Sequence, residues 1–232
     1  GAHAAPASRA AACSASARPA PQALVDGRRF EGLAFTSANT LLASGARGGV
    51  AFAEEIDLDE GAVTPRSMPP TVRATYGRLP GGDWLVGADQ GGDEVNHLFS
   101  LAPSGRLTDL TPGASVIADF EGWSKDGRTF FVALNARDPR VFDLYAVDAA
   151  SLERRLIFTG GDYRFNRPGA NDAAAVNPGQ DLVAVEKVVS NIKSDAILRN
   201  VAGGREENLS EGDGDVINRP LGFDPRGRAL YL

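Results

Sequence analysis

The chain has 232 residues, and its 43% hydrophobic content is typical of a globular protein rather than a disordered one. The formal net charge is −6 and the Lys and Arg residues are scattered, which argues against binding to a nucleic-acid backbone. No run of about 18 apolar residues occurs, so no transmembrane helix is expected. The 27 Gly and 14 Pro lie between short apolar runs, as in an all-β fold.

Residues 1–25 are expected to form a flexible arm rich in Ala and Pro, without hydrophobic periodicity. Such an arm resembles the end of a targeting segment and favours an exported or periplasmic protein, with the cytoplasm as the alternative. Cys13 follows three alanines, as at a lipoprotein cleavage site, but no apolar run of signal-peptide length precedes it. The sequence otherwise leaves the compartment open.

From about residue 26 onward, a strand-turn-strand phrase recurs. Its clearest copy is at residues 123–132, and related phrases occur at 79–86, 176–183 and 223–231. The turn glycines of the four copies lie roughly 50 residues apart, a repeat length typical of β-propeller blades; they are Gly82, Gly127, Gly179 and Gly227. Within the copy at 176–183, Gln180 stands in the place of the turn glycine when the later strands are aligned.

Each repeat predicts four strands, so the expected fold is an all-β propeller of four-stranded antiparallel blades. The expected blades cover about residues 28–70, 72–113, 115–162, 163–214 and 216–232. The fifth is incomplete, because residues 229–232 correspond to its second strand. About four blades and the start of a fifth cannot close a ring, so residues 26–232 are expected to be part of a longer propeller.

The distribution of apolar residues supports radial blades. The second strand is an unbroken apolar run, as at 130–134 and 182–185, which suits a strand covered on both faces. The third strand alternates, and the fourth is short and polar, as at 107–110, which protects an exposed sheet edge. A β-sandwich also contains many short strands, but strict return of one four-strand unit favours a propeller.

Four phrases carry a family resemblance; they lie at residues 91–99, 107–112, 122–128 and 135–145. They resemble the N-terminal propeller of prolyl oligopeptidase-family serine peptidases, particularly the bacterial dipeptidyl and acylaminoacyl peptidases. The resemblance extends over about residues 26–232. It implies a non-catalytic half that caps an α/β-hydrolase domain and admits only short peptides or unstructured chain ends.

The catalytic half of that family needs a Ser on a turn between glycines, followed by an acidic residue and a His. No Gly-x-Ser-x-Gly occurs here, and the only histidines are His3 and His97. We therefore expect no catalytic residue in this chain and no turnover of aminoacyl or peptidyl nitroanilides. Turnover that a serine-directed inhibitor abolishes would contradict this expectation.

Candidate substrate-facing residues lie in the loops between second and third strands, which project from one face of a propeller. This candidate rim consists of Asp93, Glu94, Arg137 and Arg140, with Asn191 and Lys193 beside them. The alternative is that the carboxylates are merely solvated and that the Arg and Asp side chains hold their own loop. The opposite face, which carries the other turns, is the second choice for a binding surface.

No metal or cofactor site is expected. His97 has no second His or Cys near it in the sequence, so we expect a strand-edge histidine hydrogen-bonded to its own loop. Asp213 and Asp215 supply only half of a calcium loop. No phosphate-binding or dinucleotide-binding glycine motif occurs.

Two further functions remain open on the sequence. One is a stand-alone protein-binding propeller similar to the periplasmic propeller of the Tol system, which would dock a partner on its rim. The other is a propeller lyase or glycosidase, which would need clustered His, Arg and carboxylate side chains. The leading hypothesis is gating and size selection of peptide substrates for a hydrolase domain outside this sequence.

Overall fold

The computed structural model describes residues 28–35, 37–47, 50–66, 68–89, 93–161, 163–164, 176–203, 205–212 and 214–232. These residues form strands and turns, and every pairing between named strands is antiparallel. The expected arm, with His3 and Cys13, lies outside the described residues, as does Asp213.

Four sheets have four strands each, and a fifth has two. The first contains β1 (Arg28–Phe35), β2 (Thr40–Arg47), β3 (Val50–Asp57) and β4 (Val63–Arg66), and the second contains β5 (Val72–Arg78), β6 (Trp84–Ala88), β7 (His97–Leu101) and β8 (Leu107–Asp109). The third contains β9 (Ala118–Trp123), β10 (Thr129–Asp138), β11 (Val141–Asp148) and β12 (Arg154–Phe158). The fourth contains β13 (Tyr163–Arg164), β14 (Leu182–Ser190), β15 (Lys193–Asn200) and β16 (Glu207–Asn208), and the fifth contains β17 (Gly222–Phe223) and β18 (Leu230–Tyr231).

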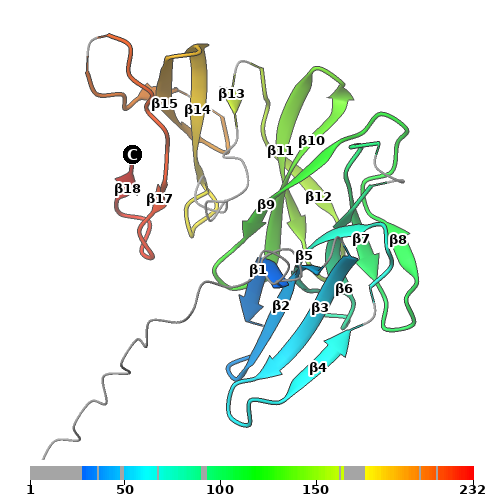
Figure 1. The fold of residues 1–232 in the computed structure, drawn as a ribbon. Coiled ribbons are helices and arrows are strands. Elements are labelled where there is room, and N and C mark those ends of the chain that lie inside the picture. The colour runs from blue at the N-terminus through cyan, green and yellow to red at the C-terminus, as the bar shows by residue number, and fades with distance from the viewer. Residues whose placement is uncertain are drawn as a thin grey trace, which may run out of the picture.

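Every sheet is a simple up-and-down meander, since strands adjacent in sequence are adjacent in the sheet. Figure 1 shows the sheets following one another in chain order around an open arc, from blue to red. The fold is therefore an all-β arrangement of propeller blades that does not close, as the sequence predicts. We number the blades 1 to 5 in chain order.

The hydrophobic core lies between blades rather than inside one sheet. Strand β10 illustrates the reason, because its successive side chains point to opposite faces. Phe130, Val132 and Leu134 pack in a cluster shared with blade 2, which includes Leu85. Phe131 and Ala133 pack in a separate cluster shared with blade 4. A third cluster joins blades 1 and 2. The unbroken apolar run of the second strand is thus covered on both faces, as expected.

The outer strands follow the sequence-based expectation only in part. In β11 the side chains alternate as expected, and both faces are covered, because Leu144 and Ala146 pack toward blade 4 while Val147 packs toward blade 2. The fourth strand of blade 3 is not uniformly polar, because Ile157 and Phe158 at its end are buried in the seam. Wide seams between blades need apolar side chains beyond the inner two strands.

The turn between first and second strands has a fixed backbone in the repeated phrase. Gly127 and Gly227 have φ of 68° and 66°, a left-handed conformation that favours glycine. Gln180 adopts the same conformation, with φ of 56°, at the equivalent position of blade 4. The alignment of Gln180 with the turn glycines is therefore correct, and this turn keeps its geometry without a glycine.

Candidate functional site

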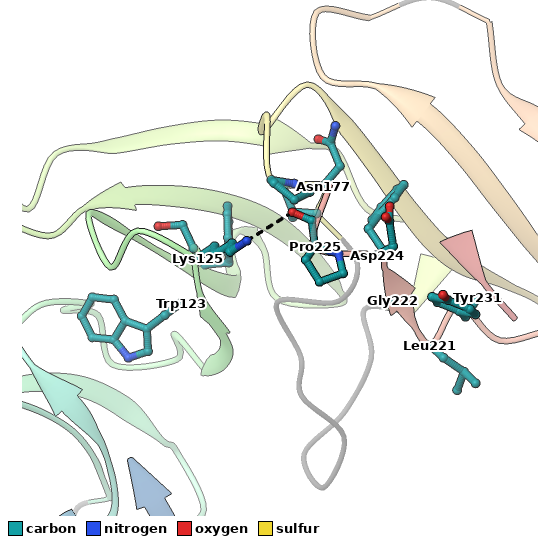
Figure 2. Close-up of a pocket in the computed structure, with 13 residues that line it drawn as sticks. Trp123, Lys125, Asn177, Leu221, Gly222, Asp224, Pro225 and Tyr231 are labelled. Carbon is teal, nitrogen blue, oxygen red and sulfur yellow. Dashed lines mark hydrogen bonds between the residues drawn. The ribbon is translucent and has the colours of Figure 1, made fainter. Parts of the chain in front are cut away.

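A pocket of about 800 Å³ lies between the first-to-second strand turns of blades 3, 4 and 5. We call it the turn pocket. Its walls are mainly apolar and come from three separate parts of the chain; they include Trp123, Phe131, Val176, Leu221, Phe223 and Tyr231. Figure 2 shows Trp123 and Lys125 on one side of it and Leu221 and Tyr231 on the other. An apolar concavity with few polar groups is the usual form of a ligand site.

Each turn is held by a polar side chain at its start, which accepts hydrogen bonds from backbone amides beyond the turn. The Ser124 hydroxyl oxygen accepts from the amide of Thr129 at 3.0 Å. The Asn177 side-chain oxygen accepts from the amides of Asp181 and Leu182 at 3.0 and 2.9 Å. A carboxylate oxygen of Asp224 accepts from the Ala229 amide at 2.9 Å. These bonds give the pocket rigid edges.

The Trp123 indole is fixed against the neighbouring blade. Its Nε1 donates to the carbonyl of Tyr76 at 2.5 Å, and its ring meets that of Phe130 edge-on with centroids 5.4 Å apart. The ring therefore cannot turn away without losing a hydrogen bond in a half-buried seam. Trp123 therefore borders the turn pocket at the end of β9, while its indole packs in the seam between blades 2 and 3.

Lys125 is the lysine of the pocket lining, and its side chain is exposed. Its Nζ donates to the carbonyl of Pro225 at 3.4 Å, the contact dashed in Figure 2. This long hydrogen bond joins the turns of blades 3 and 5 across the pocket. Asp224, the acidic lining residue, uses its carboxylate within its own turn, and hydrogen bonds led by that from the Ala229 amide lower its pKa.

The candidate rim lies at the other end of the strands. Asp93 and Glu94 sit in the loop between β6 and β7, where both are exposed and Glu94 has a left-handed φ of 61°. An Asp93 carboxylate oxygen accepts from the amide of Val95 at 3.1 Å. Asn191 and Lys193 belong to the equivalent hairpin of blade 4.

Arg137 and Arg140 both belong to the β10–β11 hairpin, but they have different partners. Arg140 pairs with Asp138 of its own hairpin at 2.9 Å, and hydrogen bonds from Arg140 lower the pKa of Asp138 to about 2. The expected loop-holding Arg–Asp pair is therefore present. Arg137 instead binds the fully buried Asp143 through two hydrogen bonds of 2.6 and 2.8 Å.

The sequence reasoning missed two similar pairs on this face. Arg73 forms two hydrogen bonds of 3.1 Å with the buried Asp89, and Arg219 binds Glu186 at 3.0 Å. Both arginine side chains are half-exposed. The Arg219–Glu186 pair joins blade 4 to the segment entering blade 5, so no local spacing in the sequence could have identified it.

His97 opens β7, as expected, but its hydrogen bond is not to its own loop. Its Nδ1 lies 2.7 Å from a carboxylate oxygen of Asp109, on the outer strand β8 of the same blade. The side chain is buried, and its Nε2 has no hydrogen-bond partner within the described residues. The histidine therefore pins two strands together, which is a structural role.

Within the described ranges, no group of three or more His, Cys, Asp or Glu side chains could hold a metal ion. In the same part of the chain, no helix is long and apolar enough to span a membrane.

The succession of four-stranded antiparallel sheets is the fold of a β-propeller, and superposition on solved structures gives the same fold. A structure of TolB from Acinetobacter baumannii superposes with a TM-score of 0.55 at 12% identity, covering 88% of this chain and 48% of that one. A Bacteroides ovatus protein described as a dipeptidyl aminopeptidase IV superposes with a TM-score of 0.53 at 10% identity, covering 81% of this chain and 30% of that one. Identities this low establish the fold alone.

Sequence comparison is more specific. Over 151 residues the chain is 41% identical to dipeptidyl aminopeptidase BIII of Pseudoxanthomonas mexicana, a match that covers 62% of this chain and 20% of that protein. No model of a known protein family matches the chain. The chain thus spans about a fifth of the length of this relative. The resemblance to the propeller of dipeptidyl peptidase-like, prolyl oligopeptidase-family proteins is confirmed.

Proposed function

We propose that residues 26–232 are the non-catalytic propeller portion of a prolyl oligopeptidase-like serine peptidase. In this proposal the blades restrict access to an α/β-hydrolase domain outside these 232 residues, so that extended peptides enter and folded proteins do not. The observation that carries it is the 41% identity to a dipeptidyl aminopeptidase over 151 residues. The lack of a Gly-x-Ser-x-Gly sequence in the chain agrees with a supporting role.

The mechanism is steric, and the seams between blades are its weakest points. In the seam between blades 1 and 2, Glu55 adds a polar contact to the shared apolar cluster, and its side chain is 13% exposed. Glu55 binds Arg66 of its own blade and Arg78 of blade 2, the latter at 3.1 Å. Removal of this carboxylate charge should let the two blades separate more often, and so relax the size limit on substrates.

The test uses the natural protein that contains this chain. The kcat/KM for a dipeptidyl nitroanilide is compared with that for a long unstructured peptide, in wild type and in Glu55→Gln. We expect the variant to raise the relative rate on the long peptide by about threefold or more, because the seam opens more readily. The matched control, Glu206→Gln, removes a carboxylate whose recorded partners, Tyr163 and Arg199, belong to its own blade 4, and it should leave the ratio unchanged.

Two results would overturn the proposal. One is a natural protein with no peptidase activity sensitive to a serine-directed inhibitor. The other is an unchanged substrate ratio in Glu55→Gln when hydrogen exchange shows that the seam between blades 1 and 2 has become less protected.

A second candidate function is a protein-binding propeller, favoured by the superposition on TolB over 88% of this chain. Peptide mapping and intact-mass measurement on the natural protein separate the two. A following domain of roughly 250 residues with Gly-x-Ser-x-Gly, Asp and His supports the peptidase. A chain that ends after a few more blades supports the binding propeller instead.

A further inference from the structure

We propose that the outer edge of blade 3 binds an extended acidic segment of another protein, which adds to the sheet as a further strand beside β12. The side chains of that segment alternate between the seam with blade 2 and the opposite face of the sheet. Blades 2 and 3, which form this surface, each have all four of their strands. The proposal is independent of the peptidase function, since it involves neither a hydrolase domain nor turnover.

The outer strand of blade 3 is less protected against pairing than the outer strands of blades 1, 2 and 4. Strand β4 contains Pro65, whose nitrogen carries no hydrogen, and β8 and β16 are only three and two residues long. Strand β12 has five residues and no proline. The exposed edge of such a strand is a template on which a further strand can pair.

The hydrogen-bond ladder shows which backbone groups of β12 point outward. The Asp148 amide donates to the carbonyl of Glu153 at 3.0 Å, where the β11–β12 hairpin closes. Because hydrogen-bonded and non-hydrogen-bonded pairs alternate in an antiparallel ladder, Arg155 is the next residue of β12 that bonds to β11. The N–H and C=O groups of Arg154 and Leu156 therefore point away from β11 and are available to an added strand.

The charges of this edge favour an acidic partner. Arg154 and Arg155 are both exposed, and the ion pairs recorded among the described residues involve neither of them. Neighbouring residues of a strand point to opposite faces, so an added strand meets a positive charge on each face. The same charges disfavour pairing with β12 of a second copy, which also carries them.

The face of β12 that looks toward blade 2 borders a small hollow in the seam. This hollow has a volume of about 30 Å³, and Arg154 lines it together with Leu110 of blade 2 and Leu152 of blade 3. Leu156, two residues further along the same face of β12, is 45% exposed. A small apolar side chain of the added strand fits this surface, so the partner combines acidic residues with small apolar ones.

The binding of short labelled peptides to the natural protein, measured by fluorescence anisotropy, tests the proposal. Any catalytic serine is first blocked with a serine-directed inhibitor. The probe is Glu-Val-Glu-Val-Glu with both ends blocked. It is compared with the same peptide carrying Lys for Glu, and with a form in which every backbone amide is N-methylated. We expect the Glu peptide to bind about tenfold more tightly than either comparison peptide, because it alone combines negative charges with backbone donors.

Two variants locate the site. Leu156→Pro removes an outward N–H group and should weaken binding of the Glu peptide about tenfold. The double variant Arg154→Glu with Arg155→Glu should reverse the preference, so that the Lys peptide binds about tenfold more tightly than the Glu peptide. Unfolding cannot produce such a reversal. Arg128→Gln, at an exposed arginine in a turn of the same blade, is the control and should change nothing.

Equal binding of the Glu and Lys peptides, undiminished binding of the N-methylated form, or no peptide binding would each overturn the proposal. So would a double variant that keeps the original preference. Self-association of the protein that Leu156→Pro abolishes, without peptide binding, would assign the edge to a second copy of the chain instead. None of these results depends on peptidase activity, so they are separate from the size-selection test.

Discussion

At the scale of single residues, Asp143 is a buried charge whose position is fixed by several hydrogen bonds. It is fully buried and accepts hydrogen bonds from Arg137 and from the amide of Gly160, the latter at 2.8 Å. Burial by itself would raise the pKa of Asp143, but the bonds from Arg137 and Gly160 outweigh burial and lower it. The carboxylate therefore holds the β10–β11 hairpin to the segment that leads into blade 4.

We predict that Asp143→Asn destabilises the protein by about 1–3 kcal/mol at neutral pH, because charged hydrogen bonds to a buried acceptor are lost. Urea unfolding measures this change. Since the folded-state pKa of Asp143 is lowered, its contribution is present above the unfolded pKa of about 3.9 and declines as the pH falls through the folded value. The stability of the variant should consequently fall less steeply below pH 4. Glu153→Gln, at an exposed position of the same blade, is the control and should leave the neutral-pH midpoint unchanged.

Gln180 provides a second test at this scale, because it holds a left-handed backbone that costs non-glycine residues energy. We predict that Gln180→Gly stabilises the protein by about 0.5–1 kcal/mol, since its hydrogen bond to Thr129 is long at 3.3 Å. The reciprocal change, Gly127→Gln, should destabilise by about 1 kcal/mol. Thermal unfolding of both variants checks the pair, and changes of the same sign would contradict this account of the turn.

At the scale of the strand, the position of a residue within the blade decides how much its side chain contributes to the free energy of unfolding. Leu134 on β10 is fully buried in the seam with blade 2, whereas Leu156 on β12 is 45% exposed. Both are leucines on strands of the same sheet, so they form a matched pair. The comparison isolates burial from residue type and from strand propensity.

We predict that Leu134→Ala costs about 2–5 kcal/mol, because it leaves a cavity between two blades. Leu156→Ala should cost no more than about 0.5 kcal/mol. Chemical denaturation monitored by tryptophan fluorescence measures both. Similar losses at the two positions would mean that the blades do not share a core in the way that the structure shows.

At the scale of the whole molecule, neighbouring blades are joined by aromatic and polar contacts as well as by apolar packing. The ring of Tyr76 on blade 2 stacks on Phe120 of blade 3 with centroids 4.3 Å apart. Tyr76 also covers Gly87, where a Cβ would come within 2.6 Å of its hydroxyl oxygen. Burial, with smaller effects from the charges of Asp119 and Glu121, raises the pKa of Tyr76 to about 12.

This raised pKa predicts alkaline loosening of the seam between blades 2 and 3. The contribution of Tyr76 is fully present below the unfolded pKa of about 10 and is lost as the pH rises toward 12. In an ultraviolet titration, Tyr76→Phe should lose the phenolate absorbance step near pH 12. The variant should also lose less stability than wild type between pH 10 and 12. An unchanged titration curve would refute the assignment.

Much of the fold could be predicted from the sequence because its signals are local. The turn phrase at residues 123–132 and the apolar run at 130–134 each lie within one hairpin, where strand and turn preferences operate between near neighbours. Even Gln180 could be placed by its distance from the strand that follows. The same local rules anticipated that Arg140 would hold its own hairpin, and it binds Asp138.

The sites were harder to predict, because they combine residues far apart in the chain. The sequence marked the turn phrase but gave no reason to assign Lys125 to a pocket, since Pro225 lies in the turn two blades later. Two other lining residues, Trp123 and Tyr231, are likewise far apart in the chain, since they belong to blades 3 and 5. The candidate rim at Asp93, Glu94, Arg137 and Arg140 remains a prediction.

The sequence by itself determined that this chain is built from repeated four-stranded units, because hydrophobic periodicity and turn chemistry act over a few residues. It also carried the resemblance to a peptidase propeller. Only the tertiary structure decided how one blade faces the next, and with it the Arg219–Glu186 pair, the seam at Glu55 and the turn pocket. The reason is physical: contacts between blades depend on the angle and spacing of whole sheets, which no short segment of sequence encodes.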